Sequence, residues 1–330
     1  MPSERKKLLR GYACGISAAL LWGFHAVLIR VLIKQGVDPF LIGALRLFIG
    51  STTLAVLVGG FSVLKRKKIP SIRYSKFFWF IAFSLAANFL LFHKGMEFTT
   101  ASDAILLEAF SPVMGLVLAM VFFPLRIDYL MKHPGLPQKI ILIIVLGSIG
   151  SAFILMNDAQ NLFITNEAKF TGDMIEFAAM FAWALVMLSV HEYQKRDPNQ
   201  NSLAVAAQYL FVGGVIMMPF VEWTQLAAIT QTQWMWIFVL GVFSTGIAYF
   251  LWHIASNNLD VFPLMTIFNF VSVFNVTMET IVLGLKLSWK LLLGGLLVLY
   301  AAVKAEMINA KYKIGYTAEA TTDPQKMPEK

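Results

Sequence analysis

The chain has 330 residues, of which 58% are hydrophobic and only 14% are charged. These values and a mean hydropathy of +0.69 exclude a soluble globular domain, in which charged residues make up about 25% of the chain. The formal net charge of +8 allows a nucleic-acid-binding protein or a membrane protein, and the positions of the cations must decide between them. The single cysteine, Cys14, excludes an internal disulfide.

Ten apolar stretches of about 20 residues follow one another along the chain, each long enough to cross a bilayer as a helix. They predict an all-α polytopic membrane protein with ten transmembrane helices. A basic tail at 1–10 precedes them, and a polar tail at 310–330, which we expect to be flexible, follows them. The predicted spans are 11–33, 39–60, 76–96, 99–123, 139–157, 171–193, 203–222, 234–255, 261–284 and 290–309.

The first five spans and the last five form two copies of one unit. Gly11 and Trp22 recur as Gly172 and Trp183, about 160 residues later, which indicates an internal repeat. A unit with an odd number of spans must cross the membrane in opposite senses when it is repeated, so we predict two inverted five-helix repeats. Such repeats are typical of secondary transporters, whose substrate site lies between the halves. The predicted domains are the first repeat 11–158, the outside linker 159–170 and the second repeat 171–309.

Most of the 27 Lys and Arg residues fall on one side of the membrane when the N-terminus is placed in the cytoplasm. The run Lys65–Lys68 between the second and third spans is the densest group among them. This positive-inside bias predicts that both termini are cytoplasmic. Because the bias accounts for the positive charge, nucleic acid is not an expected partner, and we expect an integral protein of a bacterial-type inner membrane.

Several local patterns resemble those of one transporter family. They are Leu21-Trp22-Gly23 in the first span, Arg46 in the second, Ser111-Pro112-Val113 in the fourth, Thr245-Gly246-Ile247-Ala248-Tyr249 in the eighth and Gly294-Gly295 in the tenth. Together with the span count and the repeat, they resemble the drug/metabolite transporter superfamily, in particular its EamA-type ten-helix branch. The resemblance implies export of amino acids and other small metabolites by alternating access, and aromatic amino-acid exporters are the nearest comparison.

Glu108 is the leading candidate for a substrate- or proton-binding residue, because a charge inside a span is costly and usually faces a cavity or a partner. Helical spacing places Thr100 and Ser111 on its side of the fourth span, with Asp103 at the margin. Pro112 lacks an N–H group and so frees the carbonyl of residue 108, which suits cation or proton binding. The structural alternative is a neutral, hydrogen-bonded glutamic acid that holds two helices together.

Arg46 in the second span suits bidentate capture of a substrate carboxylate, with an ion pair or carbonyl clamp inside the first repeat as the alternative. His25 lies one turn from Trp22 and is either a titrating group or, as a lone histidine more often is, a satisfied interior residue. Trp22, Trp183 and Asn88 are further candidates for lining a cavity, although most aromatic residues of such a chain contact the core or lipid.

The ninth span carries Asn269, Asn275 and Glu279 along one polar stripe. These side chains either line the transport path or form hydrogen bonds between helices.

His93 and His253 occupy equivalent places in the two repeats. A pair of gate residues is one interpretation, and we expect the other, a position at the membrane–water interface.

The residues and the resemblance together predict a secondary active transporter, an exporter of amino acids or related metabolites with protons as the candidate coupling ion. An alternative is an exchanger or importer of a larger cationic metabolite, such as S-adenosylmethionine, for which Asp103 and Glu108 would supply an acidic pair. A polytopic membrane enzyme is a less favoured alternative, because the chain has no P-loop, H-E-x-x-H or G-x-S-x-G motif. A channel is also less favoured, because an inverted repeat favours alternating access. We expect no cofactor or metal, and a monomer or homodimer in the bilayer.

Overall fold

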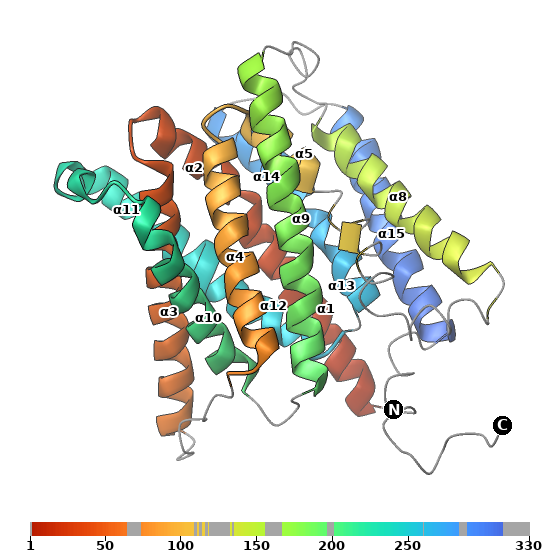
Figure 1. Cartoon of the computed structure of the whole chain (residues 1–330). Helices are drawn as coiled ribbons and strands as arrows, with labels where there is room; N and C mark the ends of the chain where they lie inside the picture. The colour runs from red at the N-terminus through yellow and green to blue at the C-terminus, as the bar shows by residue number, and fades with distance from the viewer. Residues whose placement is uncertain are drawn as a thin grey trace.

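The structure is a computed structural model that describes residues 2–64, 74–108, 111, 114–115, 118, 133, 135–155, 167–196, 201–259, 261–283 and 289–312. Over these residues the regular elements are all helical, and they gather into one bundle (Figure 1). In chain order they are α1 (Pro2–Gly23), α2 (His25–Lys34), α3 (Pro39–Leu64), α4 (Lys76–Gly95), α5 (Ala101–Glu108), α8 (Leu136–Leu155), α9 (Glu167–Arg196), α10 (Ser202–Met217), η2 (Met218–Phe220), η3 (Trp223–Ala228), α11 (Gln231–Val239), η4 (Leu240–Ile247), α12 (Ala248–Ser256), α13 (Val261–Phe268), α14 (Phe270–Leu283) and α15 (Trp289–Tyr312).

Seven helical segments of the described chain are long and apolar enough to cross a membrane. They correspond to the predicted spans 11–33, 39–60, 76–96, 139–157, 171–193, 203–222 and 234–255. The remaining predicted spans are not confirmed as single long helices. The span 99–123 is described only in part, 261–284 is divided between α13 and α14, and 290–309 lies within α15, whose apolar part is Leu292–Ala305.

Helices extend into the segments that were predicted to be tails and linker. Residues 2–10 of the predicted tail lie in α1, α9 begins at Glu167 inside the predicted linker 159–170, and α15 continues to Tyr312. The rest of that linker, the rest of the C-terminal tail and the run Lys65–Lys68 lie outside the described residues.

Polar side chains fix the starts of several helices by bonding the first free N–H groups. The Asp38 carboxylate accepts from the Leu41 N–H at 2.7 Å, directly before Pro39 begins α3. Asn201 caps α10, and Thr230 with Gln233 forms a reciprocal capping box at the start of α11. These caps set where each apolar helix enters the bundle.

Three helical paths through the interior are interrupted. The first breaks at Phe24 between α1 and α2, and the ninth predicted span breaks at Asn269 between α13 and α14. Between α11 and α12 the chain widens into η4, a π-helix. Irregular backbone of this kind often marks a functional site, and in a membrane it is tolerated only where other groups satisfy the freed carbonyls.

The carbonyls freed by the first break each meet a side-chain donor. The donors come from η4, from α2 and from α14, so the break is bonded to both halves of the chain. The pairs are Ser244 Oγ with Leu21 O at 2.8 Å, His25 Nδ1 with Trp22 O, and Asn275 Nδ2 with Gly23 O at 2.9 Å.

Close contacts between helices recur about 160 residues apart, as a repeated unit requires. Gly11 of α1 lies against Leu259, and its counterpart Gly172 of α9 lies against Phe98. Gly50 of α3 faces Thr245 closely, and Gly213 of α10 faces Leu85 at a looser distance. In Figure 1, α1 begins at the lower end of the bundle and α9 begins at the upper end.

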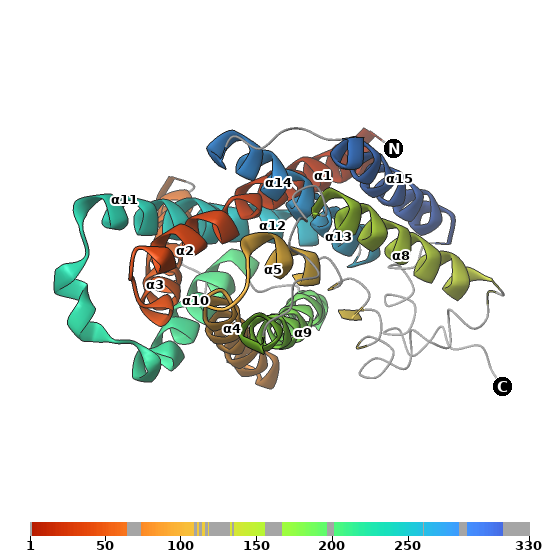
Figure 2. The ribbon, with the colours of Figure 1, turned by 90° about the horizontal axis from the view of Figure 1, so that it is seen from above.

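Buried apolar residues form one large core and one small one. The large core joins α1–α5 to α9–α14 and includes Val298 of α15. In addition, α8 and α15 lie side by side at the edge of the bundle and share a small cluster (Figure 2). That cluster consists of Leu136, Ile140, Ile143, Ile144, Ala301 and Ala305. On the outside, many large apolar side chains are exposed, among them Phe83, Phe211, Phe238 and Leu292, which fits a surface in contact with lipid.

Replacing Gly50 by alanine tests the contact between α3 and η4. A Cβ there would lie 2.5 Å from Thr245 Cγ2, whereas a Cβ at Gly59 of the same helix would meet nothing within 4 Å. We expect Gly50→Ala to lower the free energy of unfolding by about 1–3 kcal/mol through overpacking. Gly59→Ala is the matched control and is expected to be neutral or stabilising by up to about 1 kcal/mol. Thermal unfolding in detergent measures both, and equal melting temperatures would contradict the contact.

Candidate functional site

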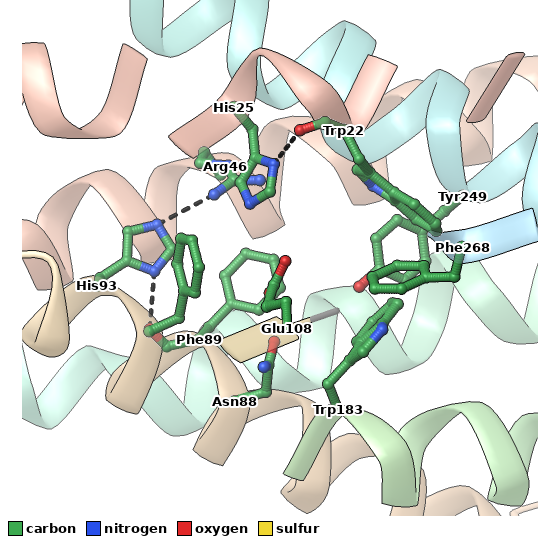
Figure 3. A pocket seen from close by; sticks show the side chains of 11 residues that line it. Trp22, His25, Arg46, Asn88, Phe89, His93, Glu108, Trp183, Tyr249 and Phe268 are labelled. Carbon is green, nitrogen blue, oxygen red and sulfur yellow. Dashed lines mark hydrogen bonds between the residues drawn. The ribbon is translucent and has the colours of Figure 1, made fainter. Parts of the chain in front are cut away.

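A pocket lies inside the bundle where α1–α5 meet α9, α12 and α13 (Figure 3). The space open to the centre of a water molecule is about 40 Å³, so this conformation holds a few waters and no large ligand. Its lining combines a cationic group, a carboxyl group, two imidazoles, an amide and six aromatic rings. These residues are Arg46, Glu108, His25, His93, Asn88, Trp22, Phe89, Phe92, Trp183, Tyr249 and Phe268.

The Arg46 guanidinium forms the cationic side of the pocket. It is 3% exposed, and its Nη1 donates to His93 Nε2 at 3.1 Å. Its centre lies 5.1 Å from the centroid of the Phe89 ring, a cation–π contact. Its Nε has no hydrogen-bond partner, and no described carboxylate forms an ion pair with it. A buried guanidinium with a free donor is suited to an anion that enters the pocket.

The hydrogen bonds of His93 fix its tautomer. Its Nδ1 lies 2.7 Å from the Phe89 carbonyl, which can only accept, so Nδ1 carries the hydrogen. The Nε2 lone pair is then left to accept from Arg46. His25 is oriented in the same way, with Nδ1 donating to the Trp22 carbonyl and its ring stacked on Phe92 at 5.1 Å. His93 is therefore a neutral acceptor beside the cation.

Glu108 ends the described part of α5 and is 7% exposed. Its carboxyl group lies between the Arg46 side of the pocket and the aromatic side (Figure 3). The charges of Glu108 and Arg46 interact, although the two side chains make no direct ion pair. The pocket therefore presents one cation and one acid that make no direct ion pair with each other.

Aromatic rings form the opposite wall, with Trp22 at their centre. Its ring centroid lies 5.5 Å from that of Trp183, 5.7 Å from Tyr249 and 5.8 Å from Phe268. Trp252 packs behind it at 5.0 Å. The Trp22 Nε1–H donates to the Ser244 carbonyl of η4 at 2.9 Å, so the ring is held in place. Such a wall suits an apolar or aromatic ligand group.

The structure brings six of the ten predicted site residues around this pocket: Trp22, His25, Arg46, Asn88, Glu108 and Trp183. Asn88 also has a structural bond, because its amide donates to the Ala179 carbonyl at 2.9 Å and joins α4 to α9.

The other predicted site residues lie elsewhere. Ser111 is buried, and its hydroxyl makes no hydrogen bond to the described residues. Asn269 lies beside α8, within 3.5 Å of Ser151 Oγ, and Asn275 bonds the first helix break. The side chain of Glu279, like the whole of Pro112, lies outside the described residues.

Two expectations about other polar residues are wrong. His93 and His253 do not face the membrane–water interface, because they are only 1% and 2% exposed. His253 forms hydrogen bonds with the side chains of Tyr209 and Gln194. Asp103 does not share the pocket with Glu108, because its carboxylate lies 3.1 Å from Lys169 Nζ of α9.

Sequence reasoning did not select five lining residues: Phe89, Phe92, His93, Tyr249 and Phe268. A signal existed for two of them. His93 has a repeat counterpart in His253, and Tyr249 ends the family-like pattern in the eighth span. The three phenylalanines carry no mark in the sequence that separates them from rings in contact with lipid.

The hydrogen bond of Trp22 can be tested against a matched ring. Trp183 Nε1 makes no hydrogen bond within the described chain, whereas Trp22 Nε1 bonds Ser244. Trp22→Phe and Trp183→Phe remove similar ring volumes. We expect Trp22→Phe to lower the free energy of unfolding by about 1–2 kcal/mol more, because it leaves a buried carbonyl unsatisfied. Thermal unfolding without ligand measures the difference, and equal losses would contradict the role of this bond.

Comparisons with known proteins agree with this architecture. A crystal structure of a protein with 17% sequence identity superposes with a TM-score of 0.68, covering 90% of this chain and 96% of the other, which shows a shared fold. A protein of Methanothermobacter thermautotrophicus, named an uncharacterized transporter, is 25% identical over 312 residues, which are 88% of this chain and 86% of that protein. The profile of the EamA-like transporter family matches twice, at residues 9–156 and 170–304. The chain therefore belongs to the EamA-like transporter family, within the drug/metabolite transporter superfamily, and is an integral membrane protein of the transporter class.

Proposed function

We propose that this transporter is a secondary active exporter of amino acids or related small metabolites. The observation that carries the proposal is that Arg46, Glu108 and an aromatic wall line the same pocket. A zwitterionic amino acid has a matching set of groups. Its carboxylate fits the free donors of Arg46, its ammonium fits the Glu108 carboxylate, and an apolar or aromatic side chain fits the rings around Trp22.

Alternating access between two inverted repeats is the mechanism we propose. Both family matches contribute to the pocket, the first through Arg46 and Glu108 and the second through Trp183 and Tyr249. The opposite starting ends of α1 and α9 in Figure 1 support inverted repeats, and the small volume of the pocket supports a closed state that must open to one side at a time. Ten spans, cytoplasmic termini and a bacterial-type inner membrane belong to the same proposal.

Proton linkage is the coupling that we propose. Glu108 is the acid in the pocket, and a carboxyl group away from water can take up a proton in one state of the cycle and release it in another. Because Arg46 interacts with the same carboxylate, a substrate carboxylate at Arg46 would change the charge that Glu108 faces. The binding of substrate and the binding of the proton would then be coupled through the electrostatic interaction between Arg46 and Glu108.

The alternative substrate, a larger cationic metabolite such as S-adenosylmethionine, has lost its main support. That hypothesis depended on an acidic pair of Asp103 and Glu108, and Asp103 is bound to Lys169 instead.

The carboxylate-binding role of Arg46 predicts a specific loss of uptake. In proteoliposomes with labelled amino acids, we expect Arg46→Gln to reduce uptake about ten- to a hundredfold, the value of a charge-assisted hydrogen bond of about 1.5–3 kcal/mol. Arg30→Gln is the matched control, because Arg30 of α2 donates to the Met96 carbonyl outside the pocket. Equal uptake by both folded variants would overturn the role of Arg46, and no uptake of any amino acid by the wild type would overturn the substrate class.

The proton role of Glu108 predicts a change in the response to pH. We expect wild-type uptake to rise with an imposed pH gradient and Glu108→Gln to lose that rise, because an amide carries no exchangeable acid proton. Glu97→Gln is the control, since Glu97 pairs with Lys94 away from the pocket. If Glu108→Gln kept both its uptake and its gradient response, Glu108 would not be the coupling group.

A further inference from the structure

A second buried acid, Glu176, lies outside the pocket. It belongs to α9, it is fully buried, and neither of its carboxyl oxygens has a hydrogen-bond partner within the described chain. An ionised carboxylate buried without a cation or donor costs several kcal/mol, so this geometry holds the neutral acid. A neutral acid inside a transporter is a stored proton.

The fold leaves room for this side chain through a glycine on the facing helix. A Cβ at Gly95, the end of α4, would lie 2.5 Å from Glu176 Oε1. In the other repeat, Gly15 of α1 is the counterpart of Glu176, and Ala255 of α12 is the counterpart of Gly95. These two residues also lie against each other, but there the glycine takes the place of the acid. The helices can therefore cross without an acid, and the space beside Gly95 is occupied by Glu176 although packing does not need a carboxyl group there.

The ionisable groups whose charges act on Glu176 are acids, and none of them forms a salt bridge or hydrogen bond with it in the described chain. Glu108 of α5 and Asp173 of α9 are the acids whose charges act on it. Asp173 lies one turn nearer the start of α9, where it accepts from Thr99 Oγ1 at 2.5 Å and from Lys169 Nζ at 3.1 Å. Lys169 also contacts Asp103 at 3.1 Å, and the cluster is partly exposed.

The charged groups near the Gly95 end of α4 are engaged elsewhere. On α4, His93 bonds Arg46, and Lys94 pairs with Glu97. Glu176 is thus a buried acid that feels the charges of both the partly exposed Asp173 and the pocket acid Glu108.

We propose that Glu176 is a second proton-binding site, which passes a proton between Asp173 and Glu108 during transport. In each transfer a proton leaves one carboxylic acid, which becomes a carboxylate, and joins the next carboxylate, which becomes the acid. No electrons move and no other reactant is needed. This inference rests on the proposed proton linkage and adds the group through which protons reach the pocket.

Infrared spectroscopy of the purified, full-length protein tests the protonation itself. A carboxylic acid and a carboxylate absorb at separate C=O frequencies, so the spectrum counts neutral acids without any transport. At neutral pH we expect Glu176→Gln to remove one carboxylic-acid band and Glu176→Asp to keep a shifted one. Glu222→Gln is the control, because Glu222 is a surface residue that bonds Thr224 and Gln225. If Glu176→Gln removed no acid band, the proposal would be overturned.

Transport in proteoliposomes tests the relay. We expect Glu176→Gln to keep exchange of labelled for unlabelled substrate, which needs no net proton movement, and to lose uptake driven by a pH gradient. We expect Glu176→Asp to recover part of that uptake. Uptake by Glu176→Gln that still responds to the gradient would overturn the relay while leaving the proposed function in place.

A third outcome separates the two proposals. If the wild type exchanged substrate but showed no gradient response, proton linkage would fail, and the relay would fail with it even with the Glu176 acid band present.

Discussion

A carbonyl group released by a break in a membrane-spanning helix must find another donor, because no water is available inside the bilayer. The break at Phe24 frees three carbonyls, and Ser244, His25 and Asn275 supply the donors. Since Ser244 and Asn275 come from η4 and α14, this requirement joins the first helix to helices far away in the sequence. Each interrupted helix also carries a pocket residue beside its irregular part: Trp22 and His25 beside Phe24, Tyr249 just after η4, and Phe268 before Asn269.

The electrostatics of the pocket follow from the groups that surround Arg46. A buried guanidinium is usually paired with a carboxylate, yet here its near neighbours are a neutral imidazole and the face of Phe89. The Phe89 carbonyl contributes to this arrangement, because it holds the His93 proton on Nδ1 and leaves Nε2 as an acceptor. The cation is thereby kept in position without being neutralised, and its remaining donor is free for an arriving anion.

The sequence predicts the helices well because long apolar stretches have few alternatives to a spanning helix. It also identifies Arg46, Glu108, Trp22 and Trp183, since charges within apolar spans and residues repeated at a fixed offset stand out. The sequence does not predict the partner of a polar side chain when that partner lies on another helix. Periodicity placed Asp103 near the face of Glu108, but only the position of Lys169 on α9 shows that Asp103 is engaged elsewhere. Asn275 belonged to a polar stripe, but its partner is a carbonyl exposed by a break that periodicity does not reveal.

The small cluster between α8 and α15 has a consequence for how cooperatively the chain unfolds. Its six residues make up an apolar core separate from the large one, and they come from the last described helix of each family match. Because contacts within a core are lost together while separate cores can be lost in turn, we expect this helix pair at the edge of the bundle to open before the large core, once Val298 and the bond from Ser151 to Asn269 are released. Detachment of α8 and α15 would leave the eleven pocket residues on the helices that remain, so local opening at this edge is separable from loss of the binding site.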